Sequence, residues 1–555
     1  MTHTPDALAA PAPSIFEIFA PSAAKYPEHE ALHIPGACRI PAREEADSWS
    51  YAQLHAHVDD LAERLAKAGY GCGHRIATAL DNSADFFIHF LACNKLGVSI
   101  VPLNAGMPPE ELAYLIGHSD CAFVIAAAHH EAHISAAITH VDRDVPLVVA
   151  WNSVPDAPAP LPNAWQMGLN AEAAILYTSG TTGKPKGCMM ANEYFVMVAA
   201  YYKAMGGHCT LEDGKERLIT PLPVNHMNAM ACSFPAMMMT GGCLIQLDRF
   251  SPSSWWDHVR ETKATCLHYL GVMPAMLLNK PESAADDFSS QIKFGFGAGV
   301  DPKHQINFER RFGFPLIEAW AMTETGAGGW MSCENEPRFP GQRCIGVPRA
   351  HMEVKLVGED GAEVPVGAPG ELLVRTKGDN PRRYFFTAYY KDDKATAEAW
   401  AGDYFHTGDV VRADDDGFYY FVDRNKNIVR RSGENIAAVE VESVIAAQDG
   451  IENLAVVPVP DDIRGEEVCA LLILKAGFAG DEGPTEDRAK AIQTAVSEAL
   501  VYFKSPGWVG FVDALPHTAS NKLARGEVKK LARALLEEGK LYDLRDGKRG
   551  SRKAS

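Results

Sequence analysis

The sequence lacks several features that mark secreted, metal-stapled or nucleic-acid-binding proteins. Its 12 cysteines are scattered over 555 residues without a Cys-x-x-Cys pair, so they indicate neither a zinc knuckle nor a disulfide framework. Positive charge is scarce too, because the formal net charge of −19 is the opposite of the basic excess that neutralises nucleic-acid phosphates. We therefore expect reduced thiols in the cytoplasm and no nucleic-acid partner.

Unbroken apolar runs and internal repeats are missing as well. The most apolar long stretch, Met227–Leu247, is interrupted by Pro235 and by the pair Gly241 and Gly242. It falls short of the roughly 20 continuous apolar residues that a spanning helix needs. The N-terminal stretch Met1–Ser14 has no basic start followed by an apolar core, so it predicts a flexible arm rather than a secretory signal. No membrane span is predicted.

The length and composition indicate an ordinary globular protein with more than one domain. A chain of 555 residues exceeds the size at which one hydrophobic core stops growing. Its 47% hydrophobic and 22% charged residues match the usual globular mixture. We predict a large N-terminal domain over residues 1–425, a small C-terminal domain over 426–540 and a flexible tail over 541–555.

The hydrophobic pattern predicts an α/β fold, because short apolar runs alternate with segments of helical spacing. The pattern occurs twice in the large domain, which indicates two α/β subdomains, and a β-rich stretch follows from Gly361. The small domain is expected to be α+β. The predicted strands are Ile76–Leu80, Val98–Leu103, Ala122–Ala127, Ala173–Tyr177, Leu218–Leu222 and Leu244–Leu247, and the predicted helices are Ala84–Leu96, Pro109–His118, Asn192–Ala204, Ser254–Lys263 and the helix that Pro302 opens and Gly313 closes.

The segment Tyr177–Gly187 carries the strongest chemical signal. It joins three glycines, a run of hydroxyl side chains and the two cations Lys184 and Lys186, between a predicted strand and a predicted helix. Such a loop can offer backbone N–H groups and positive charge to phosphates. An ordinary solvated turn is the alternative, and the density of the pattern disfavours it. A Walker loop is also disfavoured, because Pro185 stands where a magnesium-binding Ser or Thr is required.

This segment resembles the signature loop of the adenylate-forming superfamily, which contains acyl-CoA synthetases, peptide-synthetase adenylation domains and luciferases. Further segments resemble the superfamily's other motifs in the same order, over roughly residues 14–525. These are Trp320–Glu324, Phe405–Asp409, Asp423–Lys426 followed by Gly433–Asn435, and Pro516–Lys522. Phe421–Val444 together with Asp462–Gly465 looks closest to the branch of crotonobetaine and carnitine CoA ligases.

The resemblance implies an AMP-forming acid:CoA ligase that uses ATP, Mg²⁺ and coenzyme A, with a mobile small domain; a homodimer stays open. Lys522, Thr323, Glu324 and the hinge residue Lys426 are the implied catalytic residues, and Thr181 and Glu324 would hold the metal. The implied ATP and AMP contacts are Thr178, Ser179, Gly180, Thr181, Thr182, Gly183, Lys184, Lys186, Gly297, Ala298, Gly299, Trp320, Ala321, Met322, Thr323, Asp409 and Arg424. The implied acyl and CoA tunnel comprises Asn225, His226, Met227, Ala321, Gly326, Gly433 and Glu434.

Three residues depart from the family pattern. Asn521 replaces a usual glycine before Lys522, and Asn tolerates left-handed dihedrals better than most residues. Asn225 occupies a position that is commonly aromatic. Ala321 replaces a glycine that borders the acyl pocket, and its methyl group should shorten that pocket. We therefore expect a small or medium carboxylic acid with some polarity.

Two other functions remain open from the sequence. The chain could load a carrier-protein thiol instead of CoA, although it has no evident carrier domain. It could also be a non-catalytic nucleotide-binding scaffold, which the retained charged residues disfavour.

His130 and His133 resemble a zinc-protease motif that is one residue short, and we interpret them as the start of a surface helix. The Met-rich stretch Met227–Met239 is expected to be core rather than an acyl pocket.

Overall fold

The computed structural model describes residues 9–36, 48–149, 154–178, 184–358, 360–424, 427–431, 434–461, 464–478, 484–517, 523–546 and 548. The chain forms two compact units. The first comprises Met1–Lys355, Leu373–Thr407 and Ala413–Tyr420, and the second comprises Leu356–Leu372, Gly408–Arg412 and Phe421–Ser555. The domain limits predicted at 425 and 540 stay predictions.

The first unit contains a seven-stranded sheet in the order β18-β8-β7-β4-β3-β5-β6. Its centre is parallel, and β8 pairs antiparallel with both β7 and β18. The strands are β3 (Arg75–Ala79), β4 (Ser99–Pro102), β5 (Phe123–Ala126), β6 (Leu147–Val148), β7 (Glu172–Thr178), β8 (Lys186–Ala191) and β18 (Ala388–Tyr389). The associated helices are α2 (Tyr51–Lys67), α3 (Ala84–Leu96), α4 (Pro109–His118) and α5 (Glu131–Ile138).

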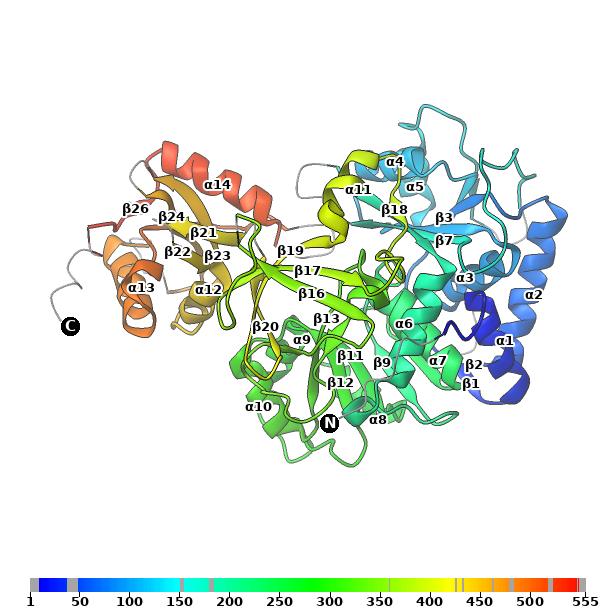
Figure 1. Ribbon diagram of the computed structural model, residues 1–555, viewed down its shortest axis with the longest axis horizontal. Helices are drawn as coiled ribbons and strands as arrows, with labels where there is room; N and C mark the ends of the chain where they lie inside the picture. Colours follow the sequence, from blue (N-terminus) through cyan, green and yellow to red (C-terminus); the bar gives the residue numbers. More distant parts are fainter. Residues whose placement is uncertain are drawn as a thin grey trace. The chain divides into compact units, whose positions relative to one another are not determined.

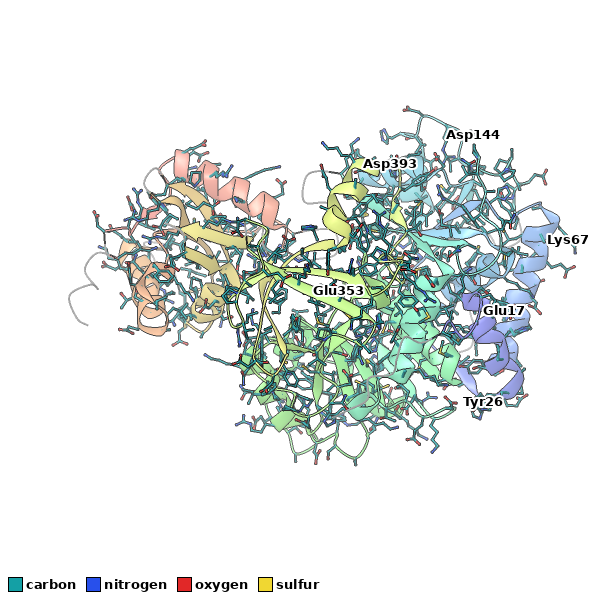
Figure 2. The ribbon with its side chains drawn as sticks, viewed as in Figure 1. Glu17, Tyr26, Lys67, Asp144, Glu353 and Asp393 are labelled. Atoms are coloured by element: carbon teal, nitrogen blue, oxygen red, sulfur yellow. The ribbon has the colours of Figure 1, made fainter. Side chains whose placement is uncertain are left out.

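Local sequence explains where these helices begin and end. Ser50 and Gln53 form a reciprocal capping box at the start of α2, so two backbone donors that would otherwise lack partners are satisfied. Apolar residues of α2 face the interior, while Lys67 extends from its exposed side (Figure 2). Gly97 closes α3 in the left-handed conformation that glycine adopts without strain. The predicted bounds of α3 and α4 are confirmed to the residue.

A second, eight-stranded sheet in the first unit has the order β14-β13-β12-β11-β9-β10-β1-β2 (Figure 1). The strands are β1 (Glu30–His33), β2 (Ser48–Ser50), β9 (Arg217–Thr220), β10 (Cys243–Gln246), β11 (Cys266–Leu270), β12 (Phe294–Ala298), β13 (Leu316–Trp320) and β14 (Met331–Ser332). Its helices are α1 (Ile15–Lys25), α6 (Asn192–Ala204), α7 (Phe234–Thr240), α8 (Trp255–Glu261), α9 (Val272–Leu278) and α10 (Pro302–Phe312). The Asp301 side chain caps α10, and Gly313 ends it.

A third sheet of five strands has the order β15-β20-β19-β17-β16, and the division into units runs through its strands. The strands are β15 (Cys344–Gly346), β16 (Met352–Val357), β17 (Gly370–Thr376), β19 (Phe405–Ala413) and β20 (Tyr419–Arg424). The short helix α11 (Asp393–Ala399) begins at Asp392, whose side chain accepts a hydrogen bond from Ala395 N. These strands confirm the predicted β-rich stretch.

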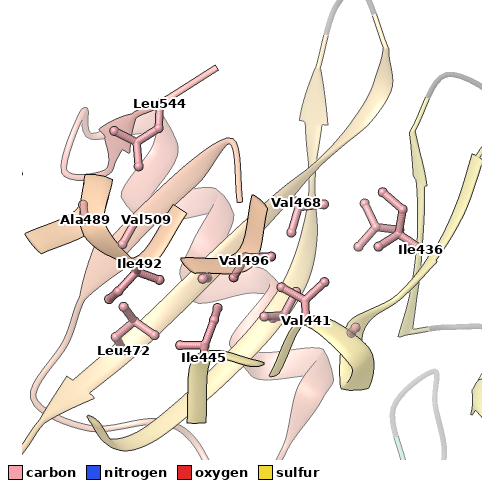
Figure 3. Close-up of a cluster of buried hydrophobic side chains, with 14 of the residues drawn as sticks. Ile436, Val441, Ile445, Val468, Leu472, Ala489, Ile492, Val496, Val509 and Leu544 are labelled. Carbon is pink, nitrogen blue, oxygen red and sulfur yellow. The ribbon is translucent and has the colours of Figure 1, made fainter. Parts of the chain in front are cut away.

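The second unit is built on a six-stranded sheet in which β24 is flanked by β21, β23 and β25. Its strands are β21 (Ile428–Arg431), β22 (Glu434–Ala437), β23 (Ile451–Asp461), β24 (Gly465–Leu474), β25 (Trp508–Phe511) and β26 (Tyr542–Asp543). Alternate residues of β24 enter two cores, because side chains alternate across a strand. Val468 and Leu472 pack with α12 (Ala438–Ala446) and α13 (Glu486–Ala499), as Figure 3 shows, and Leu471 packs with α14 (Arg525–Glu537).

The described residues 541–546 and 548 differ from the predicted flexible tail. Tyr542 and Asp543 pair with β25, and Leu544 is buried in the core that Figure 3 shows. Lys548 is also buried, and its ammonium group lies 2.5 Å from Glu467 Oε1. A polar, basic sequence suggested fraying, but sheet pairing and one buried ion pair hold these described residues.

Finally, none of the helices in the described ranges combines the length and the apolarity that a bilayer crossing requires.

Candidate active site

The structure describes most of the predicted site residues. Ser179, Gly180, Thr181, Thr182, Gly183, Lys426, Gly433 and Lys522 lie outside the described residues. Of the others, Asp409, Arg424 and Glu434 belong to the second unit, and the rest belong to the first.

The glycine-rich segment connects two antiparallel strands, and this corrects the prediction that a helix follows it directly. Thr178 ends β7 and pairs with Lys186, the first residue of β8; α6 begins only after β8. The strand was missed because its Lys-Gly start reads as loop, although its later residues are apolar. Lys184 is exposed, and its ammonium group lies 4.9 Å from the centroid of the Tyr114 ring. Both predicted lysines therefore lie at the end of the segment where β8 begins.

Tyr389 joins this hairpin to the predicted metal ligand Glu324. The Tyr389 hydroxyl donates a hydrogen bond of 3.0 Å to Glu324 Oε1. The Lys186 ammonium group lies 4.9 Å from the centroid of the same ring. Tyr389 reaches this place because β18 pairs with β8, Tyr389 lying opposite Cys188. Sequence reasoning missed Tyr389, since nothing in its immediate neighbours ties it to a residue 65 positions earlier.

Glu324 is buried and strongly affects its surroundings. Burial, followed by the charge of Glu324, raises the pKa of both Cys188 and Tyr389 well above their usual values. The Glu324 backbone is fixed as well, since its carbonyl accepts a hydrogen bond of 2.9 Å from Phe386 N. A fixed carboxylate is an oxygen ligand of the kind that Mg²⁺ binds.

The turn that carries Thr323 is closed by its neighbour Thr325. Thr325 Oγ1 accepts a hydrogen bond of 2.8 Å from Met322 N, and Thr325 itself is fully buried. Ala321, Met322 and Thr323 are half-buried, while Trp320 is buried at the end of β13. The residues after β13 are therefore held in a defined turn, and three of them stay accessible.

The segment Gly297–Gly299 lies at the end of β12 and is held by hydrogen bonds to a buried acid, Glu318. A side chain at Gly297 would meet the Tyr269 carbonyl oxygen at 2.2 Å, so this position requires glycine. Glu318 accepts hydrogen bonds from Gly299 N at 2.9 Å and from the Tyr269 hydroxyl at 2.6 Å. Burial raises the pKa of Glu318 to about 7 despite these donors. Ala298 and Gly299 remain exposed, so the predicted nucleotide contact is accessible.

Two predicted tunnel residues meet at Tyr194, which the sequence did not single out. The Tyr194 hydroxyl lies 3.8 Å from Met227 Sδ. Gly326 has a positive φ of 48°, and a Cβ there would lie 2.3 Å from the Tyr194 ring. Tyr194 is fully buried on α6, whereas Asn225, His226 and Met227 are half-buried. The structure thus brings the segments around Met227 and Gly326 together and leaves the first of them partly accessible.

A buried polar network supports the segment after Met227. Residues Asn228–Ser233 form the π-helix η4, a rare geometry that is frequent at functional sites. His268 Nδ1 lies 2.8 Å from both Ser233 Oγ and Asn228 Oδ1, and its Nε2 lies 2.7 Å from the Tyr202 hydroxyl. Burial lowers the pKa of His268 to about 3, so this ring is neutral. Met230, Met237 and Met238 are fully buried, as the core interpretation of the Met-rich stretch predicted.

In the second unit, Asp409 and Arg424 lie together. Arg424 Nε is 3.1 Å from Asp409 Oδ1, and the Asp409 side chain is almost completely buried while that of Arg424 is half exposed. Gly408 has a positive φ of 67°, and its N–H donates to Glu371 Oε1 at 3.2 Å. The predicted ribose acid and its neighbouring arginine therefore form one ion pair. Glu434 is exposed at the start of β22.

Two α/β sheets in the first unit and a small α+β second unit form the framework that carries the predicted nucleotide-binding residues. The AMP-binding enzyme model matches residues 19–385, and the model of the C-terminal domain of AMP-binding enzymes matches residues 440–522. The chain belongs to the AMP-binding enzyme family. The predicted superfamily is confirmed.

Curated relatives extend over nearly the whole chain. A sulfoacetate–CoA ligase from Cupriavidus necator is 29% identical over 92% of this chain and 97% of its own length. A crotonobetaine/carnitine–CoA ligase from Proteus mirabilis is 28% identical over 87% of this chain and 93% of its own. The predicted enzyme class, an AMP-forming acid:CoA ligase, is confirmed by this family and these relatives.

Solved structures share the fold. ATP-bound MatB from Rhodopseudomonas palustris has a TM-score of 0.76 at 24% identity, covering 93% of this chain and 98% of its own. The o-succinylbenzoate CoA synthetase MenE from Bacillus subtilis, in complex with its acyl-adenylate, has a TM-score of 0.76 at 23% identity with the same coverage. The predicted α/β architecture is thereby confirmed.

Proposed function

We propose that this chain activates a small or medium-sized carboxylic acid bearing a second polar or charged group, and transfers it to CoA in the cytoplasm. A carboxylate oxygen attacks the α-phosphorus of ATP, the bond to the bridging oxygen breaks, and pyrophosphate leaves. The CoA sulfur, after losing its proton, then attacks the acyl carbon, and AMP leaves with the electrons of the C–O bond. The products are AMP, pyrophosphate and an acyl-CoA.

The arrangement of Lys186, Tyr389 and Glu324 is the observation that carries this proposal. The Lys186 ammonium group, at the start of β8, lies over the Tyr389 ring, and the Tyr389 hydroxyl donates to the buried Glu324 carboxylate. Both contacts are beside the end of the glycine-rich segment. The α-phosphate gains negative charge as the carboxylate attacks, so fixed donors and cations there lower the barrier. When bound, Mg²⁺ would neutralise phosphate oxygens, and Glu324 would hold it. Thr181 and Lys522 are proposed to contribute a metal contact and the bridging ammonium group.

In the second unit, Asp409 is proposed to accept hydrogen bonds from both ribose hydroxyls, a task suited to a two-oxygen acceptor. Arg424, with its half-exposed side chain 3.1 Å from Asp409, would donate to the ribose or phosphate. Lys426 is proposed as the hinge, and the hairpin of Gly433 and Glu434 as part of the thiol tunnel.

The nature of the acid is proposed from the walls of the tunnel and from the relatives. The bulky Tyr194 side chain lies against Met227 and the Gly326 turn, and the Ala321 methyl group occupies a position where glycine is usual. Both features favour a short acyl site. The relatives are named for sulfoacetate and for crotonobetaine or carnitine, acids that carry a second charged group. We therefore expect a short acid with a polar or charged far end.

A panel of acids tests this proposal. ATP/pyrophosphate exchange should be highest with short acids that carry a sulfonate, ammonium or second carboxylate group, and CoA thioester should then form. A highest kcat/KM for long-chain acids would contradict the size, and acylation of a carrier protein without CoA thioester would contradict the thiol. Lys522→Ala should slow exchange by roughly 100-fold or more. The control is the second half-reaction of the same variant. When it is supplied with the acyl-adenylate, Lys522→Ala should still form acyl-CoA, because that step does not need the bridging ammonium group.

A further inference from the structure

Two adjacent histidines of the first unit point at one carboxylate. His129 Nε2 lies 2.9 Å from Asp81 Oδ2, and His130 Nε2 lies 2.9 Å from Asp81 Oδ1. The two imidazole rings are also close, with centroids 4.0 Å apart. One potential ligand atom from each residue lies within 4.8 Å of the other two. Across the described ranges, this is the one group of three His, Cys, Asp or Glu side chains that is arranged in this way.

The cluster lies where the sheet topology favours a ligand. Asp81 follows β3, and the two histidines follow β5 in the short helix η2 (Ala128–His130). β3 is parallel to β4 on one side and to β5 on the other. The chain therefore runs outward from β3 to β4 and then crosses back to β5, which makes the β3/β5 boundary a topological switch point. Open α/β sheets bind ligands beyond the carboxyl ends of their strands at such points.

The backbone on the Asp81 side of the cluster is firmly anchored. The neighbouring Asn82 is buried, and its Nδ2 donates to the Leu247 carbonyl at 2.9 Å and the Leu222 carbonyl at 3.3 Å. Its Oδ1 accepts from Val224 N at 3.0 Å. On the other side, His133 Nε2 lies 2.8 Å from the Met107 carbonyl, so His133 is already engaged and contributes to the local scaffold.

We propose that Asp81, His129 and His130 form a binding site for a divalent transition-metal ion such as Zn²⁺, with water as a further ligand. Imidazole nitrogen and carboxylate oxygen are ligands that Zn²⁺ accepts, and three protein ligands plus water complete its tetrahedron. The metal takes the place of the Nε2 protons, so each neutral imidazole carries its remaining proton on Nδ1.

The three ligand atoms lie close enough together to converge on one ion. With metal–ligand bonds of about 2.0–2.2 Å, ligand atoms of a tetrahedral site lie about 3.4 Å apart. The two histidines contact different oxygens of Asp81. When one of these oxygens binds the metal, its 2.9 Å contact lengthens by about 0.5 Å, and the other histidine turns toward the metal. The side chains of His129 and His130 are 43% and 20% exposed, so both rings have room to rotate. The competing explanation is a hydrogen bond from His130 to Asp81 Oδ1 and a close ion-pair contact from His129 to Asp81 Oδ2, and it predicts no metal binding.

Zn²⁺ titration of the full chain, without an affinity tag and without nucleotide, tests the proposal. Competition with a chromophoric chelator should show one Zn²⁺ per chain with a Kd of about 1 µM or tighter. His129→Ala, His130→Ala and Asp81→Asn should each weaken this binding by about 100-fold or more, since even supporting residues of metal sites cost 10–100-fold. His140→Ala is the matched control, because His140 is an exposed histidine just beyond α5.

Co²⁺ provides an independent readout, because its visible absorption reports the ligand geometry. The wild type and His140→Ala should show the same Co²⁺ spectrum, and His130→Ala should lose it. Circular dichroism verifies that each variant is folded. If one of the three single variants does not fold, the remaining variants still test the site. Zn²⁺ binding that is absent from the wild type, or equal in all variants, would overturn the proposal.

Discussion

The Tyr389 hydroxyl donates a hydrogen bond of 3.0 Å to Glu324 Oε1, and this contact fixes a buried carboxylate beside a glycine-rich hairpin. The two residues come from segments that the sequence separates widely, and β18 brings them together by pairing with β8. The proposed reaction gives Tyr389 no contact with ATP or with the acid. It is therefore a positioning residue, and its effect should pass through Glu324.

Tyr389→Phe should lower kcat/KM in pyrophosphate exchange by about 10-fold or more, because a hydrogen bond to a charged group contributes about 1.5–3 kcal/mol. The apparent Mg²⁺ affinity should fall as well, which a merely structural role would not cause. Tyr390→Phe is the matched control, since its hydroxyl bonds to Asp120 instead, at 2.5 Å. Equal losses in both variants, or an unchanged Mg²⁺ dependence for Tyr389→Phe, would contradict the positioning role.

Ala321→Gly should lengthen the acyl pocket. One methylene group in an apolar pocket changes kcat/KM by about 10-fold or more, so the preference should shift toward acids one or two carbons longer. The measurement is the ratio of kcat/KM for a homologous series of acids, compared with the wild type. The ratio is its own internal control, because Ala321 is also an implied ATP contact and a change in ATP binding would affect all acids of the series alike. An unchanged ratio would mean that Ala321 does not border the acid.

Gly326→Ala should destabilise the protein more than Gly402→Ala does. Both glycines have a positive φ, 48° and 63°, so both variants pay a backbone strain of about 1–2 kcal/mol. Only at Gly326 would the new Cβ collide with Tyr194, and overpacking adds about 1–3 kcal/mol. Thermal unfolding measures the difference, and the Gly326 variant should also lose activity. Equal unfolding temperatures would show that Tyr194 moves aside without cost.

Glu318 should make the first unit less stable as the pH rises. Its pKa of about 7 in the folded state exceeds the ordinary value, so the folded state holds its proton more tightly than the unfolded chain does. The resulting stabilisation is complete below the unfolded pKa and is lost as the pH rises through about 7. Relative to Glu318→Gln, the wild type should lose about 1.4 kcal/mol per pH unit between about pH 5 and 7. The measurement is the free energy of unfolding of both proteins at several pH values. If the two plots of this free energy against pH ran parallel, the prediction would be wrong.

Ending the chain after Lys540 should destabilise the second unit. The truncation removes β26 and the buried Leu544, and it leaves Glu467 without Lys548. Burial of one Leu contributes about 2 kcal/mol, so limited proteolysis of the second unit should become faster. A chain that ends after Lys548 keeps these contacts and is the control. Equal proteolysis rates would restore the interpretation of this segment as a free tail.

Local patterns were sufficient for much of the fold. The bounds of α3, α4 and α6 were predicted to the residue, because apolar spacing and glycine or proline signals agree there. The motifs also predicted Glu324, Asp409 and Arg424 as site residues. Those roles stay predictions, and the structure places Asp409 and Arg424 in contact. What local patterns could not give are partners formed by long-range pairing. Tyr389, Tyr194 and Glu318 acquire their roles only when strands or helices from distant segments pack together.

The same limit explains the two corrections. Lys186–Ala191 forms a strand because β7 and β18 flank it, and its short apolar part after the Lys-Gly start is too weak a signal by itself. Tyr542 and Asp543 form a strand because β25 offers a free edge, so a segment with polar composition becomes ordered. In both cases the tertiary environment decides the conformation, as is common for short strands.

Asn82 has a consequence for engineering the acid preference. Its amide links the end of β3 in one sheet to Leu222, Val224 and Leu247 around the other, just before the proposed acyl residues Asn225 and His226. Replacing residues 221–228 with those of another ligase would change the segment whose backbone forms these hydrogen bonds with Asn82. Such chimeras should work best when the donor segment presents the same backbone groups to Asn82.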